Sequence, residues 1–210
     1  MRDGLWRAAI AGPLTGAIAR LRASGEATRR LVIALAGPPG AGKSTLAAEA
    51  AAALPDATVL PMDGYHLDNA ILSERGLMAR KGSPDSFDAA GFLALLRRLH
   101  AEPEIIHPIF DRSRDLSLAG AGRVAPEHRL VLVEGNYLLL DRLVWRDLAP
   151  LFDLTVMVSA PRDVLAARLH ARWQGLGRDD DAIARHLEND LANLDTVLAE
   201  SAPAQLTLAG

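Results

Sequence analysis

The sequence predicts an α/β fold in which a doubly wound, mostly parallel sheet is flanked by helices and carries a lid segment. A glycine-rich loop at 37–44 joins an apolar run to an alanine-rich segment, and apolar runs alternate with helical segments along all 210 residues. No internal repeat or long linker interrupts this alternation. Because parallel strands need long crossovers, usually helices, the pattern favours one doubly wound unit. We therefore expect a single domain over 1–210, with an N-terminal helical segment in 1–30.

The first part of the chain surrounds the glycine loop. Residues 4–23 are expected to be helical, with an interruption near Gly12 and Pro13, because proline lacks the backbone donor that a helix needs. The run 31–36 is apolar throughout, as a strand buried on both faces should be. The alanine-rich segment 43–54 has strong helix propensity.

The middle of the chain is more irregular. A second strand is expected at 58–62, and the polar segment 64–86, broken by glycines and a proline, is expected to be an insertion with little helix. Asp88 is suited to cap the N-terminus of a helix that runs through His100. The later elements are expected, in order, as a strand near 105–109, a hairpin or loop excursion at 111–126 around 119–122, a strand at 130–133, a short helix at about 142–149, a strand at 154–159, helices at 162–173 and 180–198, and an edge strand at 205–208.

Composition excludes several classes of protein. The formal net charge is −3 and no basic block occurs, so nothing in the sequence favours binding to nucleic acid. The chain has no cysteine, which excludes disulfides and thiolate metal sites. No apolar run is long enough to span a membrane, and residues 1–10 lack the apolar region of a signal peptide. We expect a cytoplasmic domain of enzyme size.

The glycine loop is the strongest functional signal. It reads Gly-Pro-Pro-Gly-Ala-Gly-Lys-Ser and fits G-x-x-x-x-G-K-[ST] without a mismatch. In such a loop the backbone N–H groups converge, and the dipole of the following helix favours an anion there. A chance match is the alternative, but the apolar strand and the helix on either side argue against it. The sequence therefore predicts that ATP binds to Gly37, Pro38, Pro39, Gly40, Ala41, Gly42, Lys43, Ser44 and Thr45, with Lys43 reaching the β- and γ-phosphates and Ser44 ligating Mg²⁺.

Two acidic residues follow strands that should end at the same edge of the sheet. Asp63 comes directly after 58–62, and Glu134 directly after the apolar run 130–133. Ligands bind at this edge in open α/β sheets. A carboxylate there can accept a proton from an attacking hydroxyl and help to hold Mg²⁺. The alternatives are a turn aspartate before Gly64 and a glutamate that faces solvent.

The order of these motifs resembles one family of P-loop enzymes. The glycine loop is followed by Asp63-Gly64-Tyr65-His66, Ser86-Phe87-Asp88, Pro108-Ile109-Phe110-Asp111 and Val133-Glu134-Gly135. Over roughly residues 31–195 this series resembles the phosphoribulokinase, uridine kinase and bacterial pantothenate kinase family, and most of all a bacterial subgroup named fructose transport system kinases. The resemblance implies Mg²⁺-dependent transfer of a phosphoryl group from ATP to an alcohol.

The same resemblance implies roles for individual residues. Asp63 is implied to be the catalytic base and a metal ligand, with Ser44 and Glu134 as the other metal ligands. Phe87, Asp88 and Asp111 are implied to lie near the acceptor. Gly64 stands where uridine kinases usually carry an acidic or polar residue, and the long N-terminal extension of pantothenate kinases is missing, so the acceptor stays open.

A lid is predicted at 174–181, where Gly175 and Gly177 permit hinge dihedrals. Arg168 and Arg172 lie four positions apart just before it and share a helix face, and Arg178 lies within it. In related kinases, lid arginines neutralise charge on the transferring phosphoryl group. We assign this role first to Arg172, with a solvated basic face as the alternative.

Further residues are candidates for contact with the acceptor. Arg114 belongs to the charged run 111–115, and Asn189 shares a helix face with Asn193. A salt-bridged turn and an exposed polar helix face are the respective alternatives, and His66 can equally be an ordinary loop histidine. The candidates are His66, Phe87, Asp88, Asp111, Arg114, Tyr137 and Asn189.

The sequence therefore predicts a P-loop kinase that uses ATP and Mg²⁺, with Lys43, Asp63 and Arg172 as catalytic residues. Its partner is a small hydroxylated metabolite, with a sugar favoured over a nucleoside and a nucleoside over pantothenate. A nucleotide switch or a P-loop ATPase is the alternative class, although the chain lacks the Asn-Lys-x-Asp element of guanine-specific switches. The oligomeric state stays open, with a homodimer as one alternative.

Overall fold

A computed structural model describes residues 3–24, 29–177 and 179–209, with the backbone only for 3–11. The α-helices are α1 (Asp3–Ala23), α2 (Lys43–Ala53), α3 (Asn69–Glu74), α4 (Ala89–Ala101), α5 (Arg162–Gly175) and α6 (Asp180–Glu200). The strands are β1 (Leu31–Ala36), β2 (Ala57–Pro61), β3 (Ile105–Asp111), β4 (Leu116–Val124), β5 (Leu130–Gly135), β6 (Leu154–Ser159) and β7 (Leu206–Ala209). Short 3₁₀ turns are η1 (Met62–Tyr65), η2 (Met78–Arg80), η3 (Pro84–Ser86) and η4 (Trp145–Leu151).

The central sheet has five strands in the order β2-β5-β1-β6-β7, and every neighbouring pair is parallel. The chain leaves β1 for β2 on one side and later returns to β6 on the other, so β1 lies at the topological switch point of the sheet. The predicted α/β class is confirmed, as is the edge strand at the C-terminal end. Ligands of such sheets bind beyond the carboxyl ends of the strands near this point.

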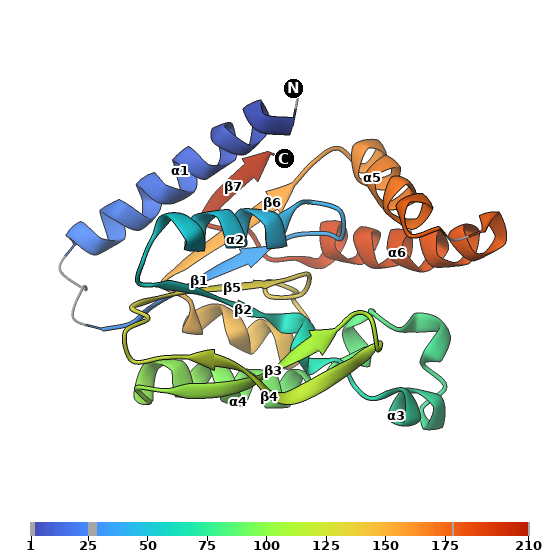
Figure 1. Cartoon of the computed structure of the whole chain (residues 1–210), viewed down its shortest axis with the longest axis horizontal. Coiled ribbons are helices and arrows are strands. Elements are labelled where there is room, and N and C mark those ends of the chain that lie inside the picture. The colour runs from blue at the N-terminus through green and yellow to red at the C-terminus, as the bar shows by residue number, and fades with distance from the viewer. Residues whose placement is uncertain (1–2, 25–28, 178, 210) are drawn as a thin grey trace.

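Two apolar layers enclose the sheet. Successive residues of β1 point to opposite faces, so Val32 and Ala34 join one buried cluster, and Ile33 and Leu35 join the other. Helix α4, η4 and the β3–β4 hairpin cover the first face, and α1, α2 and α5 cover the second (Figure 1). Because every residue of β1 and β5 is buried, these strands form a rigid support for the loops that follow them.

Helix α1 corrects one sequence-based expectation. It runs without a break through Pro13, whereas an interruption was predicted there. A proline inside a helix costs about 3 kcal/mol. Leu14 and Ile18 are buried against the second face of the sheet, and each such side chain contributes about 1.5–3 kcal/mol, so tertiary packing outweighs the local cost. Residues 1–2 and 25–28 of the predicted N-terminal segment lie outside the described residues.

The hairpin corrects a second expectation. β3 and β4 pair with each other in an antiparallel sheet of their own, and the turn lies at 112–115 instead of around 119–122. The carboxylate of Asp111 fixes this turn by accepting bonds from the backbone N–H groups of Ser113 and Arg114. Gly122 lies inside β4, where a Cβ atom would come within 2.2 Å of the buried His107 ring. Gly122 is therefore explained by its close packing against His107 and not by a turn.

The insertion at 64–86 holds more helix than predicted. Three 3₁₀ turns and α3 occupy much of this segment, and Asp68 caps α3 by accepting a bond from the Ala70 N–H. Gly64 is buried under the hairpin, where a Cβ atom would lie 2.3 Å from the Pro108 carbonyl oxygen. The glycine after Asp63 thus permits the hairpin to pack directly over the end of β2. No helix in the described ranges is both long and apolar enough to cross a membrane.

Candidate active site

The glycine loop connects β1 to α2 at the carboxyl edge of the sheet. Gly40 and Gly42 have φ of 82° and 88°, in the left-handed region that glycine adopts without strain. A Cβ atom on Gly40 would lie 3.3 Å from both Leu169 Cγ and the Leu165 carbonyl oxygen, so α5 packs tightly behind the loop. The loop and the first turn of α2 therefore present backbone N–H groups suited to an anion.

Lys43 is buried at the centre of the site. Its Nζ donates to the Pro38 carbonyl oxygen at 3.0 Å and to Asn136 Oδ1 at 2.8 Å. Burial lowers the pKa of Lys43 to about 8, while the carboxylates of Glu134 and Asp63 partly oppose this shift. Asn136 was not identified from the sequence. The only available signal was its position two residues after Glu134, at the same strand end.

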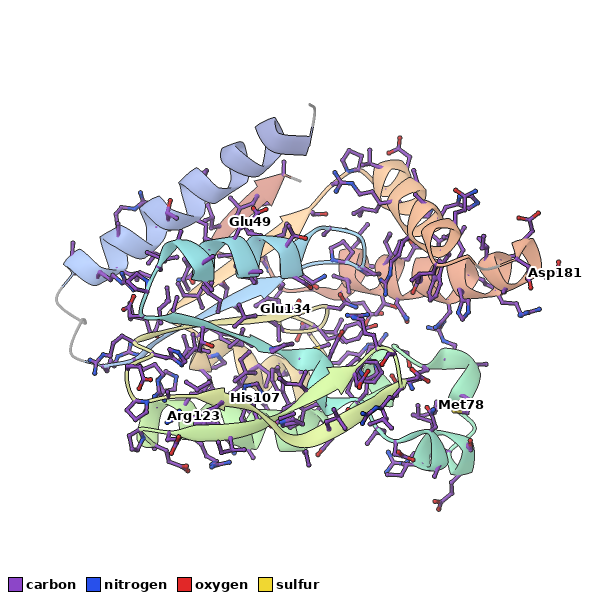
Figure 2. All side chains as sticks on the ribbon, in the orientation of Figure 1. Glu49, Met78, His107, Arg123, Glu134 and Asp181 are labelled. Carbon is purple, nitrogen blue, oxygen red and sulfur yellow. The ribbon has the colours of Figure 1, made fainter. Side chains whose placement is uncertain are left out.

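Glu134 ends β5 and is 7% exposed. It lies near the middle of the molecule, between α2 and the β3–β4 hairpin in this view (Figure 2). Burial raises the pKa of Glu134, and the Asp63 carboxylate adds to the increase, while the Lys43 cation and a hydrogen bond with Ser44 oppose it. Ser44, Asp63 and Glu134 are thus brought to one place, as the sequence predicts.

Asp63 lies in η1, directly after β2. Its Oδ2 accepts a hydrogen bond at 2.6 Å from the Nη2 of Arg112, which lies in the turn of the β3–β4 hairpin. Arg112 belongs to the charged run 111–115, but the sequence did not identify it as the partner of Asp63. The side chain of Asp63 is 25% exposed, so its carboxylate is partly accessible to solvent beside its ion pair with Arg112.

The oxygen donors at this place suit a hard cation. Mg²⁺ prefers carboxylate and hydroxyl oxygens, and is usually bound by one or two carboxylates together with substrate phosphates. Ser44 and Glu134 share a hydrogen bond, and Asp63 acts electrostatically on Glu134. The described residues contain no group of three His, Cys, Asp or Glu side chains that would form a metal site by itself. The donor set therefore fits Mg²⁺ held jointly with a nucleotide.

A group of aromatic rings packs next to Asp63, beginning with His66. His66 Nδ1 is 2.8 Å from the Asp63 carbonyl oxygen, and its ring lies between Phe87 and Phe110, with centroid distances of 4.0 and 4.6 Å. Burial lowers the pKa of His66, which favours the neutral imidazole. Phe87 also contacts the buried Tyr137 edge to face at 5.7 Å. Three of the predicted acceptor residues thus form one aromatic wall, in which His66 is partly exposed while Phe87 and Tyr137 belong to the buried core.

Three other predicted acceptor residues form hydrogen bonds or ion pairs with residues close to them in the sequence. Asp88 is exposed and caps α4 by accepting a bond from the Gly91 N–H. The Asp111 carboxylate organises the hairpin turn, and its Oδ2 lies 3.4 Å from the Arg114 Nε. The charged atoms of all three therefore bond within their own segments.

Asn189 lies on α6 and connects this helix to the insertion. Its Oδ1 accepts a bond from Arg80 Nη1 at 2.8 Å, and its Nδ2 donates to the Lys81 carbonyl oxygen at 2.7 Å. Asn193, one turn further along, accepts a bond from Arg80 Nη2 at 3.2 Å. The two asparagines share a face as predicted. Their common partner, Arg80, was not found from the sequence.

The junction of α5 and α6 contains the predicted lid. Arg172 is exposed, its guanidinium lies 5.5 Å from the Trp173 ring centroid, and its charge lowers the pKa of Lys43. Arg168 Nη1 lies 3.5 Å from the Gly40 carbonyl oxygen. Trp173 stacks on His186 at 4.1 Å and so ties the two helices together. Arg178 lies outside the described residues.

Comparison with known proteins identifies the family. No family model matches the chain. The chain is 38% identical over 186 residues to the uncharacterized protein YggC of Escherichia coli strain K12, covering 85% of this chain and 77% of that one. It is 34% identical over 185 residues to a candidate uridine kinase of Schizosaccharomyces pombe, covering 80% of this chain and 78% of that one.

A solved structure agrees with these relatives. The crystal structure of a candidate fructose transport system kinase from Silicibacter sp. TM1040 superposes with a TM-score of 0.88 at 44% identity, over 94% of this chain and 98% of that one. With the glycine loop, the buried lysine and the acidic strand ends in place, the chain belongs to the P-loop kinases of the phosphoribulokinase, uridine kinase and bacterial pantothenate kinase family, and it is a phosphotransferase.

Proposed function

We propose that this kinase transfers the γ-phosphoryl group of Mg·ATP to an alcohol group of a small hydroxylated metabolite, with a sugar in first place. The observation that supports this best is the position of Asp63. Its partly exposed carboxylate lies close enough to the buried Lys43 to act on the pKa of the lysine. A sugar is favoured because the relative with 44% identity is described as a candidate fructose transport system kinase. A nucleoside and pantothenate remain the alternative acceptors.

The chain's own residues supply the proposed chemistry. The glycine loop binds the phosphates, and Lys43 donates to oxygens of the β- and γ-phosphates. The acceptor oxygen forms a bond to the γ-phosphorus while the bond to the bridging oxygen breaks, ADP leaves, and the proton of the hydroxyl passes to Asp63. Ser44, Asp63 and Glu134 are the residues that would hold Mg²⁺, which would supply positive charge to the β- and γ-phosphates.

The acceptor is proposed to lie beside Asp63, against the partly exposed end of the aromatic wall at His66. The residues proposed for acceptor contact are His66, Phe87, Asp88, Asp111, Arg114, Tyr137 and Asn189. The neutral His66 can exchange hydrogen bonds with a hydroxyl, and the rings of His66 and Phe110, which are both partly exposed, suit the carbon face of a sugar. We place the enzyme in the cytoplasm, with a homodimer as one alternative assembly.

An acceptor panel tests the proposal. The release of ADP from Mg·ATP is measured with sugars, nucleosides and pantothenate, each compared with a reaction that lacks an acceptor. One compound should stimulate ADP release strongly, and phosphate analysis of the product should place the phosphoryl group on it. Rapid ADP release that no acceptor changes would instead assign the chain to the P-loop ATPases.

The junction at 174–181 is proposed to close over both substrates. We expect Arg172→Ala to lower kcat by about 10²-fold while ATP affinity changes little, because the charge that Arg172 meets grows in the transition state. Hydrogen exchange measures the closure directly. Protection of 174–181 should rise when a non-hydrolysable ATP analogue and the acceptor are added together.

A matched variant separates this role from a general effect of charge. Arg97 lies exposed on α4, and Arg97→Ala should leave both kcat and exchange at the junction unchanged. If exchange at 174–181 stays constant in enzyme saturated with both ligands, the junction is a surface turn and Arg172 is a solvated charge.

A further inference from the structure

A hollow lined by basic residues lies at the edge of the sheet opposite the glycine loop. Arg30 directly precedes β1 and Arg129 directly precedes β5, and these two parallel strands pair with each other. Each strand has six residues and is therefore about 20 Å long, and their far ends lead to the glycine loop and carry Glu134 (Figure 1). The hollow has a volume of about 290 Å³, and its charged and titratable lining residues are Arg29, Arg30, His100, Glu102, His128 and Arg129.

Arg30 is a half-buried cation that is held by backbone groups alone. Its Nε, Nη1 and Nη2 donate five hydrogen bonds, which use every N–H donor of the guanidinium. In the part of the chain that the structure describes, no carboxylate forms an ion pair with it. Arg30 thus fixes the chain around the hollow and keeps its full charge there. The five accepting carbonyl groups belong to Leu99, Glu102, Pro103, Ala125 and His128.

Two carboxylates near the hollow are paired with other arginines. Glu102 is the acidic residue of the lining, and both of its carboxylate oxygens accept hydrogen bonds at 2.8 Å from Arg98, four positions earlier. Asp153 forms an ion pair with Arg29. Neither carboxylate neutralises Arg30, so positive charge exceeds negative charge in the lining of the hollow.

Electrostatics shows that two of these cations act on each other. Burial lowers the pKa of Arg30, and the positive charge of Arg129 lowers it further. The two guanidinium groups therefore repel each other at the edge of the sheet. An anion placed between them would replace this repulsion with attraction, and arginine binds phosphate through two parallel N–H donors.

His128 adds a hydrogen-bond donor to the lining. Its Nδ1 accepts a hydrogen bond from the Ala125 N–H at 3.0 Å, so the hydrogen of the neutral ring lies on Nε2. The volume of the hollow limits the size of the ligand, because pockets for small-molecule ligands measure about 300–1,000 Å³. A hollow of about 290 Å³ suits a small anion better than a nucleotide.

We propose that this hollow binds a small phosphate-bearing anion, such as pyrophosphate or a phosphomonoester, at a site separate from the nucleotide site. Arg129 and the Nε2 of His128 donate hydrogen bonds to the phosphate oxygens, and Arg30 contributes its fixed charge. The bound anion joins the residues that precede β1 and β5, so it stabilises the folded chain. This site goes beyond the proposed kinase function and does not depend on it.

Calorimetric titration with pyrophosphate tests the site. Saturating ADP occupies the glycine loop, which could otherwise bind the same probe, and the ionic strength is kept constant. Arg129→Glu should weaken binding by about tenfold or more, since a charged hydrogen bond is lost and a negative charge is introduced. Arg75→Glu, the same change at an exposed position after α3, should bind pyrophosphate as the wild type does. Arg30 is left unchanged, because its loss would leave five carbonyl groups without their donor.

Thermal unfolding measures the same site independently and shows that each variant folds. A ligand that binds only the folded chain raises Tm by mass action. Pyrophosphate should raise the Tm of the ADP-saturated wild type and of Arg75→Glu, and it should have little effect on Arg129→Glu. Arg129→Met, which removes the charge without reversing it, should show a smaller rise in Tm than the wild type.

Several results would overturn the inference. Pyrophosphate that does not bind the ADP-saturated wild type, or that binds Arg129→Glu and Arg75→Glu equally well, would show that the hollow is not an anion site. Without ADP, binding that is lost in Lys43→Ala but kept in Arg129→Glu would assign the anion to the glycine loop. Vesicles of phosphatidylglycerol distinguish a lipid headgroup from a free anion. Sedimentation of the chain with these vesicles, without binding of pyrophosphate, would make the hollow a membrane contact instead.

Discussion

Lys43→Ala is expected to lower kcat/KM by about 10³-fold or more, the largest loss among the variants considered. The variant removes the cation that lies buried within the glycine loop, where its Nζ donates to the Pro38 carbonyl oxygen and to Asn136 Oδ1. Bound phosphates would replace these neutral acceptors with negative charge that increases as transfer proceeds. Steady-state assays with saturating acceptor measure the loss, and near wild-type activity would contradict the nucleotide site.

The same lysine predicts a dependence of stability on pH. Because burial lowers its pKa from 10.5 to about 8, the folded state binds fewer protons at this site than the unfolded state between these two pH values. The stability of the wild type should therefore rise with pH in this window, and the cost of burying the cation should be complete below pH 8.

Lys43→Met tests this linkage, since it keeps the aliphatic chain and removes the charge. Without ligands the variant should have a higher Tm than the wild type at pH 7, and the difference should shrink as the pH rises from about 8 toward 10.5. A lower Tm at pH 7 would show that the bonds to Pro38 and Asn136 outweigh the cost of desolvation. Such a result would leave the catalytic prediction intact, because that prediction concerns bound phosphate.

Local patterns were sufficient to predict the frame of the site. The apolar run 31–36, the glycine loop and the alanine-rich helix are each set by neighbouring residues, and the structure has them as β1, the loop and α2. Asp63 and Glu134 could be placed at one edge because the carboxyl ends of parallel strands coincide, a rule that needs no knowledge of side-chain contacts.

Contacts between distant segments could not be predicted in this way. Arg112 and Asp63 are 49 positions apart, and Arg80 and Asn189 are 109 apart. These pairs depend on how the hairpin and α6 pack around the insertion, which no local pattern encodes. Each asparagine or arginine involved resembles an ordinary surface residue in the sequence.

Two of the errors in the fold have a related cause. Proline at position 13 and glycine at 122 are typical of breaks and turns, and they were interpreted accordingly. In the structure, burial of neighbouring leucine and isoleucine carries α1 past the proline, and the ring of His107 needs the space that Gly122 leaves. Packing thus decides between two local interpretations that are both reasonable.

Asp63→Asn is the second large effect, with an expected decrease in kcat of about 10²–10⁴-fold and little change in ATP affinity. The amide keeps the size and polarity of the side chain but cannot accept the proton of the attacking hydroxyl. It also loses the charge that pairs with Arg112. Measuring kcat at saturating acceptor separately from the affinity for an ATP analogue distinguishes loss of the base from loss of nucleotide binding.

Asp68→Asn provides the matched control, because Asp68 lies in the same insertion and caps α3 through its side chain. Asparagine caps a helix about as well as aspartate, so this variant should retain wild-type kcat and stability. The decisive comparison is between the two measurements on Asp63→Asn. If ATP affinity collapses while kcat remains, Asp63 holds the metal or the local structure, and the proton must pass to another group. If kcat falls alone, the carboxylate acts on the acceptor, which is the behaviour that its partly exposed position next to His66 predicts.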